Sequence, residues 1–209
     1  MKETQDMSVD PAKAAGERTS GPESGASEVS LSAADAFLEK ILKNYTSCYD
    51  IERISPAEDY LTARAQFHEH QSGYVLVRRA EMWSADRHEY VWFYRIPELT
   101  QELFRTCMER TLAESQAYVK PEAGHMCSNV VAIFICERVQ PEAEAALRKY
   151  RYRKSFQFSL KGWMEVHAAA VGMEADAVTA NSAARATQQF LESLLHPRTK
   201  KRFSLGRRS

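Results

Sequence analysis

Residues 148–171 read RKYRYRKSFQFSLKGWMEVHAAAV, and this stretch alternates between two kinds of side chain. From Tyr150 onward the even positions are mainly aromatic or aliphatic, whereas the odd positions up to Glu165 are mainly basic or polar. Because successive side chains of a β-strand point to opposite faces, this period of two predicts a strand with one face toward a core. Gly162 predicts a bend or bulge that divides the stretch into two strands.

Helix and strand signals surround this stretch. Apolar residues recur at three- and four-residue spacing after Ser32, Thr100 and Asn181, which predicts three capped helices, the first ending near Asp50. Pro141 predicts a further short helix. The other predicted strands are residues 61–70, 74–83, 88–96 and 130–136, and apolar residues on both faces of the last two predict central strands covered on both sides. The order α-β-β-β-α-β-α-β(-β)-α predicts an α+β fold, with helices packed on a mixed, largely antiparallel sheet.

Composition predicts one domain with two tails. Residues 1–31 are rich in Ser, Gly, Ala, Pro and Glu and contain no aromatic residue, so a disordered N-terminal tail is expected. Residues 32–196, the predicted domain, carry 19 basic and 22 acidic side chains. Residues 197–209 carry six basic and no acidic side chains, which predicts a basic, disordered C-terminal tail. The formal net charge of the whole chain is zero, so overall charge favours neither nucleic acid nor membrane as a partner.

Cysteine spacing and hydropathy predict a cytoplasmic protein. The four cysteines lack CxxC spacing, and buried free thiols in a reducing cytoplasm are expected. No N-terminal apolar segment resembles a signal peptide, and the longest apolar stretch, residues 130–136, is too short to span a bilayer. No phosphate-loop or dinucleotide fingerprint occurs, so no cofactor is predicted.

Several segments together resemble a known family. They are YTSCYDIER (45–53), YVLVR (74–78) with Trp83, HEYV (88–91), VAIFICE (131–137) and KSFQFSLKGW (154–163). As a set they are similar to an uncharacterised family of bacterial proteins that carry a domain of unknown function, over roughly residues 35–195. The resemblance implies no established activity, ligand or catalytic residue, so the candidate sites rest on the residues alone.

The first candidate site is the odd-numbered face of the alternating stretch. Arg151, Arg153 and Lys161 are expected to project from it among serine and glutamine side chains. A basic row on a rigid sheet suits an acidic protein or a phosphorylated ligand. Phe156 and Phe158 are expected on the opposite, core face, which makes them poor platforms for nucleic-acid bases. A solvated face whose arginines pair with acidic side chains is the other interpretation.

The second candidate site uses acidic and imidazole side chains. Helix, three-stranded meander, helix and strand is also the core order of nuclease-like folds, which bind a divalent metal through Asp and a Glu-x-Lys pair. The candidate residues are Glu81, Asp86, Glu89, His68 and His70. Val91 stands where the lysine would follow the glutamate, so the usual electrostatic partner is missing and no metal site is predicted.

The third candidate is the basic C-terminal tail, which would attach the protein to anionic lipid or nucleic acid. Each cation near a charged membrane contributes about 1 kcal/mol to binding. A solubilising end is the other interpretation of this segment. Together these observations favour a non-enzymatic binding or interaction domain, with a metal-dependent hydrolase or nuclease and tail-driven attachment as the alternatives.

Overall fold

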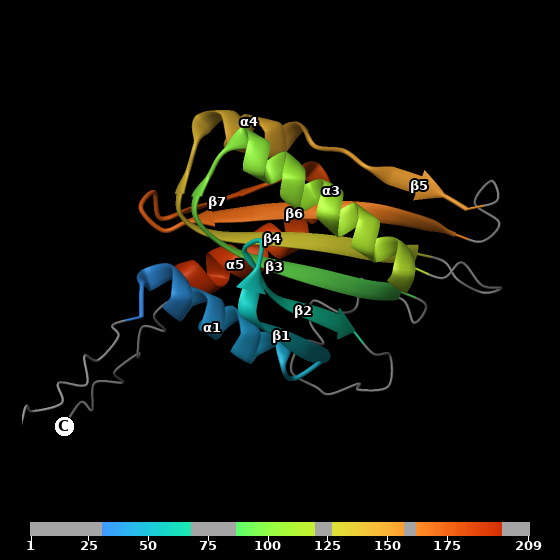
Figure 1. The fold of residues 1–209 in the computed structure, drawn as a ribbon, viewed down its shortest axis with the longest axis horizontal. Coiled ribbons are helices and arrows are strands. Elements are labelled where there is room, and N and C mark those ends of the chain that lie inside the picture. Colours follow the sequence, from blue (N-terminus) through green and yellow to red (C-terminus); the bar gives the residue numbers. More distant parts are fainter. Residues whose placement is uncertain (1–30, 68–86, 120–126, 157–161, 198–209) are drawn as a thin grey trace, which may run out of the picture. The chain divides into compact units, whose positions relative to one another are not determined.

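The computed structural model describes residues 31–67, 87–119, 127–156 and 162–197 (Figure 1). Their helices and strands are α1 (Ala33–Tyr45), β1 (Tyr49–Glu58), β2 (Leu61–Phe67), β3 (Arg87–Leu99), α3 (Gln101–Tyr118), β4 (Cys127–Val139), α4 (Pro141–Lys149), β5 (Arg153–Ser155), β6 (Trp163–Gly172), β7 (Ala177–Ala180), the 3₁₀ helix η1 (Ser182–Ala184) and α5 (Arg185–Leu195).

In the part of the chain that the structure describes, seven strands form one mixed sheet. Its order is β1-β2-β3-β4-β6-β5, and β7 pairs with the second half of β6 (Figure 1). The β3–β4 and β4–β6 pairs are parallel, whereas the other four pairs are antiparallel. The predicted α+β fold with a mixed, largely antiparallel sheet is confirmed.

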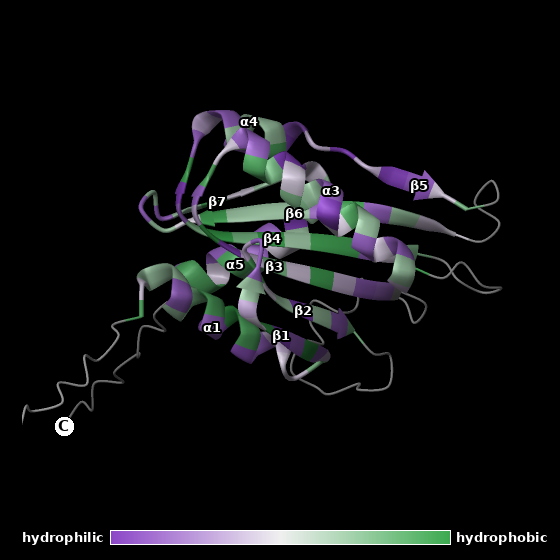
Figure 2. Ribbon diagram, viewed as in Figure 1, coloured by the Kyte–Doolittle hydropathy of each residue, from purple (hydrophilic) through white to green (hydrophobic). Residues whose placement is uncertain are grey.

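Helices cover both faces of this sheet. α3 and α4 lie on one face, and α1 and α5 lie on the other (Figure 1). Even-numbered side chains such as Trp92 and Phe134 pack in the first layer, whereas the odd-numbered Phe93 and Ile133 pack in the second. Figure 2 shows that β4 is largely hydrophobic along its length. The sequence therefore predicted correctly that β3 and β4 are central strands covered on both sides.

The predicted helix starts are confirmed by side-chain caps. The Ser32 hydroxyl accepts a hydrogen bond from the Asp35 amide at 3.1 Å at the start of α1. Thr100 does the same for α3 through the Leu103 amide at 3.1 Å. Asn181 caps η1, the turn that leads into α5. These side chains satisfy amide groups that have no partner within the helix.

The first helix and the first strand differ from the prediction. α1 ends at Tyr45, and β1 begins at Tyr49. Cys48 and Tyr49 continue the apolar spacing of the helix, but Cys48 lies in a turn, and Tyr49 begins a strand and packs on the same side of the sheet as α1. β1 is the outermost strand and most of its side chains are exposed, so it lacks an apolar alternation. The predicted strand 74–83 and residues 68–70 lie outside the described residues.

The alternating stretch contains two strands, β5 and β6, as predicted. Gly162 stands between them with a φ of 74°, a conformation that favours glycine. Its carbonyl accepts a hydrogen bond from the Phe156 amide at 2.9 Å. The odd-numbered side chains of β6 do not form one open polar face, because the last of them, Ala169 and Val171, are buried on the side of α1 and α5.

All four cysteines are buried free thiols, as predicted. Burial raises the pKa of Cys107 to about 11 and that of Cys136 to about 12, which keeps both thiols protonated at neutral pH. Among the described helices, none combines the length and the apolar composition that crossing a bilayer requires.

Candidate functional site

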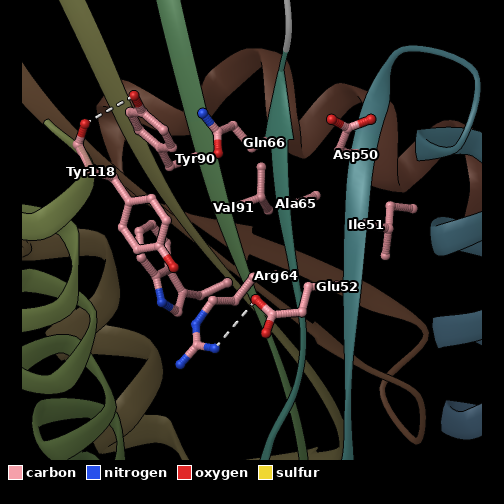
Figure 3. Close-up of a pocket in the computed structure, with 10 residues that line it drawn as sticks. Asp50, Ile51, Glu52, Arg64, Ala65, Gln66, Tyr90, Val91 and Tyr118 are labelled. Carbon is pink, nitrogen blue, oxygen red and sulfur yellow. Dashed lines mark hydrogen bonds and ion pairs between the residues drawn. The ribbon is translucent and has the colours of Figure 1, made fainter.

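The faces of β1 and β2 on the side of α3 carry polar side chains. Cross-strand pairing with β3 arranges them in two rows, Asp50–Gln66–Tyr90 and Glu52–Arg64–Trp92. Together with Tyr118 at the end of α3, they line a groove of about 220 Å³ (Figure 3). The groove is open because α3 packs on β3 and β4, whereas β1 and β2 extend beyond it.

An aromatic wall closes the groove on the side of α3. The Tyr90 hydroxyl donates a hydrogen bond to the Tyr118 carbonyl oxygen at 3.1 Å, which fixes the end of the helix to the sheet (Figure 3). The Tyr118 ring lies 5.5 Å from the Tyr90 ring and 5.9 Å from the Trp92 ring, measured between centroids. Tyr118 is 36% exposed, whereas Tyr90 and Trp92 are buried. This wall therefore presents the Tyr118 ring to solvent over a rigid aromatic base.

Glu114 on α3 holds the polar floor in place. One of its carboxylate oxygens accepts hydrogen bonds from Arg64 at 2.8 Å and 3.0 Å and from the Trp92 indole at 2.8 Å. The other oxygen accepts one from Arg110 at 2.7 Å. Burial alone would raise the pKa of Glu114, but these hydrogen bonds outweigh it and lower the pKa. The carboxylate therefore stays ionised and keeps the Arg64 guanidinium beside α3.

Arg110 extends this network to the hairpin between β1 and β2. Its guanidinium donates to the Glu58 carbonyl oxygen at 2.7 Å and to the Glu58 carboxylate at 3.1 Å. It also lies 3.5 Å from the Asp59 carboxylate. Asp59 and Tyr60 form the turn, with φ values of 45° and 68°. These contacts fasten the outer hairpin to α3 at one end of the groove.

Of the predicted basic row, the structure describes Arg151 and Arg153. Arg151 precedes β5, and its guanidinium donates to the carbonyl oxygens of Arg148 and Tyr150 at 2.8 Å and 2.7 Å. Arg153 lies in β5 and stacks over the Trp163 ring, 4.7 Å from its centroid. Both arginines are exposed. Lys161 lies outside the described residues, so the row remains a prediction.

Of the predicted acidic and histidine site, the structure describes Glu89. This residue lies on β3 on the side of α1 and is only 6% exposed. Its carboxylate accepts a hydrogen bond from the Tyr49 hydroxyl at 2.9 Å. Burial raises the pKa of Glu89 to about 7, although hydrogen bonds from Tyr49 and Asn129 oppose the rise. At neutral pH its carboxyl group is thus present in both protonation states.

The other predicted members of that site, Glu81, Asp86, His68 and His70, lie outside the described residues. Within the described ranges, no group of three or more His, Cys, Asp and Glu side chains is arranged to hold a metal ion. Val91 is buried in the core against α1, as its apolar character suggested. Residues 198–209 of the basic C-terminal tail also lie outside the described residues.

The groove itself was missed from the sequence. Its polar residues on β1 were assigned to the end of a helix or to a connection, because β1 has little apolar alternation. One signal was available: Asp50 and Glu52 flank Ile51, and Arg64 and Gln66 flank Ala65, so two short polar rows repeat with a period of two. Pairing these rows required the register of β1 on β2, which the tertiary structure supplies.

Comparison with known proteins places the chain in a family. A family model described as a domain of unknown function (DUF8052) matches residues 33–193, which is most of the chain and agrees with the expected range. No curated protein and no solved structure matches the chain. The chain therefore belongs to the family of proteins that carry the domain of unknown function DUF8052.

Proposed function

We propose that this chain is a non-enzymatic binding domain and that the groove between α3 and the outer strands β1 and β2 is its ligand site. The observation that carries this proposal is the open, aromatic-walled groove whose polar floor is held rigid by Glu114. Concave sites that combine aromatic walls with a few fixed polar groups are typical of ligand binding. At about 220 Å³ the groove suits a side chain or a small metabolite rather than a nucleotide.

The chemistry of the groove supports binding over catalysis. Arg64 is held by Glu114, and the Tyr90 hydroxyl donates a hydrogen bond to the Tyr118 carbonyl oxygen. Neither contact activates a nucleophile or places a general base near an exposed atom. Glu89, whose raised pKa would suit acid–base chemistry, is buried on the opposite face of the same sheet. The groove thus offers shape and charge through hydrogen bonds that hold Arg64 and Tyr90 in place.

The binding proposal can be tested by ¹H–¹⁵N NMR. The probes are free amino acids, monosaccharides, nucleosides and short peptides, and the reporters are the Trp92 indole N–H and the Tyr118 amide. We expect one class of probe to shift both signals saturably in the wild type and not in a groove-filling Gln66→Trp variant. A Gln189→Trp variant, altered at an exposed site on α5, should bind like the wild type. Saturable binding that survives Gln66→Trp, or no response to any class, would overturn the proposal.

The metal-dependent hydrolase or nuclease stays as the alternative proposal. Among the described residues, the elements from α1 to β4 follow the core order of nuclease-like folds. On the side of α1, however, β2 presents Ala63 and Ala65, which offer no metal ligand. Metal analysis of the purified protein, combined with a nuclease assay, separates the two proposals. A stoichiometric divalent metal with cleavage activity would favour the hydrolase, whereas its absence would leave binding as the better account.

A further inference from the structure

Resting on the proposed function of the groove, we infer that its ligand is a positively charged side chain, a guanidinium or ammonium group presented by an extended segment of a partner protein. The groove places carboxylates on its outer strand and aromatic rings on its inner wall. A cation that crosses from the sheet edge toward α3 would contact both. Charge, aromatic geometry and the position of β1 each support this ligand class.

The described residues in and around the groove carry an excess of negative charge. Asp50, Glu52, Glu58, Asp59 and Glu114 supply five carboxylates, whereas Arg64 and Arg110 supply two guanidinium groups, which leaves a formal charge of −3. Such a local excess attracts cations and repels anions. The groove is therefore opposite in sign to the basic row predicted from the sequence.

Arg64 does not reverse this preference. Two of its guanidinium nitrogens donate to Glu114 at 3.0 Å and 2.8 Å, so its charge is compensated within the protein. Its contact with Glu52 is 3.6 Å, which is longer than a hydrogen bond. The Glu52 side chain is 65% exposed, so its carboxylate retains acceptor positions for a ligand. Glu52 thus offers an exposed carboxylate at the floor of the groove.

The aromatic wall favours the same ligand class. The exposed ring of Tyr118 faces the groove beside Trp92 and Tyr90 (Figure 3). The negative face of an aromatic ring attracts cations, and a guanidinium group can also stack on a ring. An acidic floor beside an aromatic wall therefore selects for a flat or compact cation over a neutral polar group.

The position of β1 points to a peptide as the source of this cation. β1 is the outermost strand, and within the described residues no other strand pairs with its outer edge. Tyr49–Arg53 pairs regularly with β2, whereas the register shifts between Arg53 and Glu58. A peptide that adds to the regular half would place alternate side chains directly beside Asp50 and Glu52, on the face of the groove.

The test compares three pentapeptides, Ac-Thr-Val-Xaa-Val-Thr-NH₂, whose central residue is Arg, its neutral isostere citrulline, or Glu. Binding to the full chain is measured by calorimetry and by the NMR signals of Trp92 and Tyr118. We expect the Arg peptide to bind saturably, about tenfold more tightly than the citrulline peptide, and the Glu peptide to cause no shift. Raising the salt concentration should weaken binding of the Arg peptide.

Single charge removals locate the site. Glu52→Gln should weaken the Arg peptide about two- to fivefold, and Asp50→Asn should act in the same direction. Glu142→Gln, which removes an exposed carboxylate from α4, should leave the affinity unchanged. Equal affinity of the Arg and citrulline peptides, or an affinity that Glu52→Gln leaves unchanged, would overturn the inference. If the Glu peptide shifts the groove signals, or the citrulline peptide binds at least as tightly as the Arg peptide, the ligand class is wrong while the proposed binding function stands.

Discussion

The two faces of the outer strands β1 and β2 differ in whether a helix covers them, although the same segments form both faces. On the side of α1, Ile51, Ala65 and Val91 pack into the core with the helix. On the side of α3, Glu52 and Arg64 remain accessible, because α3 covers β3 and β4 instead. Alternation along a strand assigns side chains to two faces, but the position of a helix decides which face is core and which is groove. The comparison predicts that substitutions on the two faces of the sheet have different effects.

The largest effect is expected for truncation on the covered face. Phe93 is fully buried beneath α1. Phe93→Ala should lower the free energy of unfolding by about 3–5 kcal/mol, because burial is lost and a cavity remains. Truncation on the open face, Gln66→Ala, should change the free energy of unfolding by no more than about 0.5 kcal/mol. Urea denaturation of both variants measures the difference, and similar losses would show that the two faces are covered alike.

A pH-dependent effect is expected from Glu89 on the covered face. Its pKa in the folded protein is about 7, compared with an ordinary value of 4.5, so between these values the folded state holds a proton that the unfolded chain has lost. The resulting stability is fully present below about pH 4.5 and is lost as the pH rises through 7. Glu89→Gln removes this titration while keeping a side chain that accepts the Tyr49 hydrogen bond.

We therefore expect the wild type to lose on the order of 3 kcal/mol relative to Glu89→Gln between pH 4.5 and pH 8. Chemical denaturation across this range measures the loss. Glu142→Gln, at an exposed carboxylate, is the control and should follow the wild-type profile. Parallel profiles for the wild type and Glu89→Gln would mean that the buried carboxyl group does not titrate near neutrality.

The smallest effect is expected at the opposite edge of the sheet, at β5. Arg153 is exposed and stacks on Trp163, so Arg153→Ala should cost about 0.5–1 kcal/mol of unfolding free energy. Arg151→Ala should cost less, since its carbonyl partners are exposed to water. If these arginines form the anion surface predicted from the sequence, reversing both to Glu should lower the salt concentration that elutes the protein from heparin. Unchanged elution would remove β5 as a binding surface.

Much of the fold was predictable because its signals are local. The caps at Ser32 and Thr100 and the two-sided apolar strand β4 were all recognised from short patterns. β1 was missed because an edge strand with one covered face needs few apolar residues. Of the predicted site residues, Glu89 is buried and accepts a hydrogen bond from Tyr49, and only its neighbours across the sheet show this.

The sequence by itself determined most of the element types, the central strands and the odd- or even-numbered face to which their side chains belong, because these depend on local periodicity and capping. Only the tertiary structure decided that β1 pairs outside β2 and that α3 leaves the outer strands open. It also decided that Glu114 gathers Arg64 and Trp92 across distant segments. Register and helix placement follow from long-range packing, and that packing turns two short polar rows into a groove.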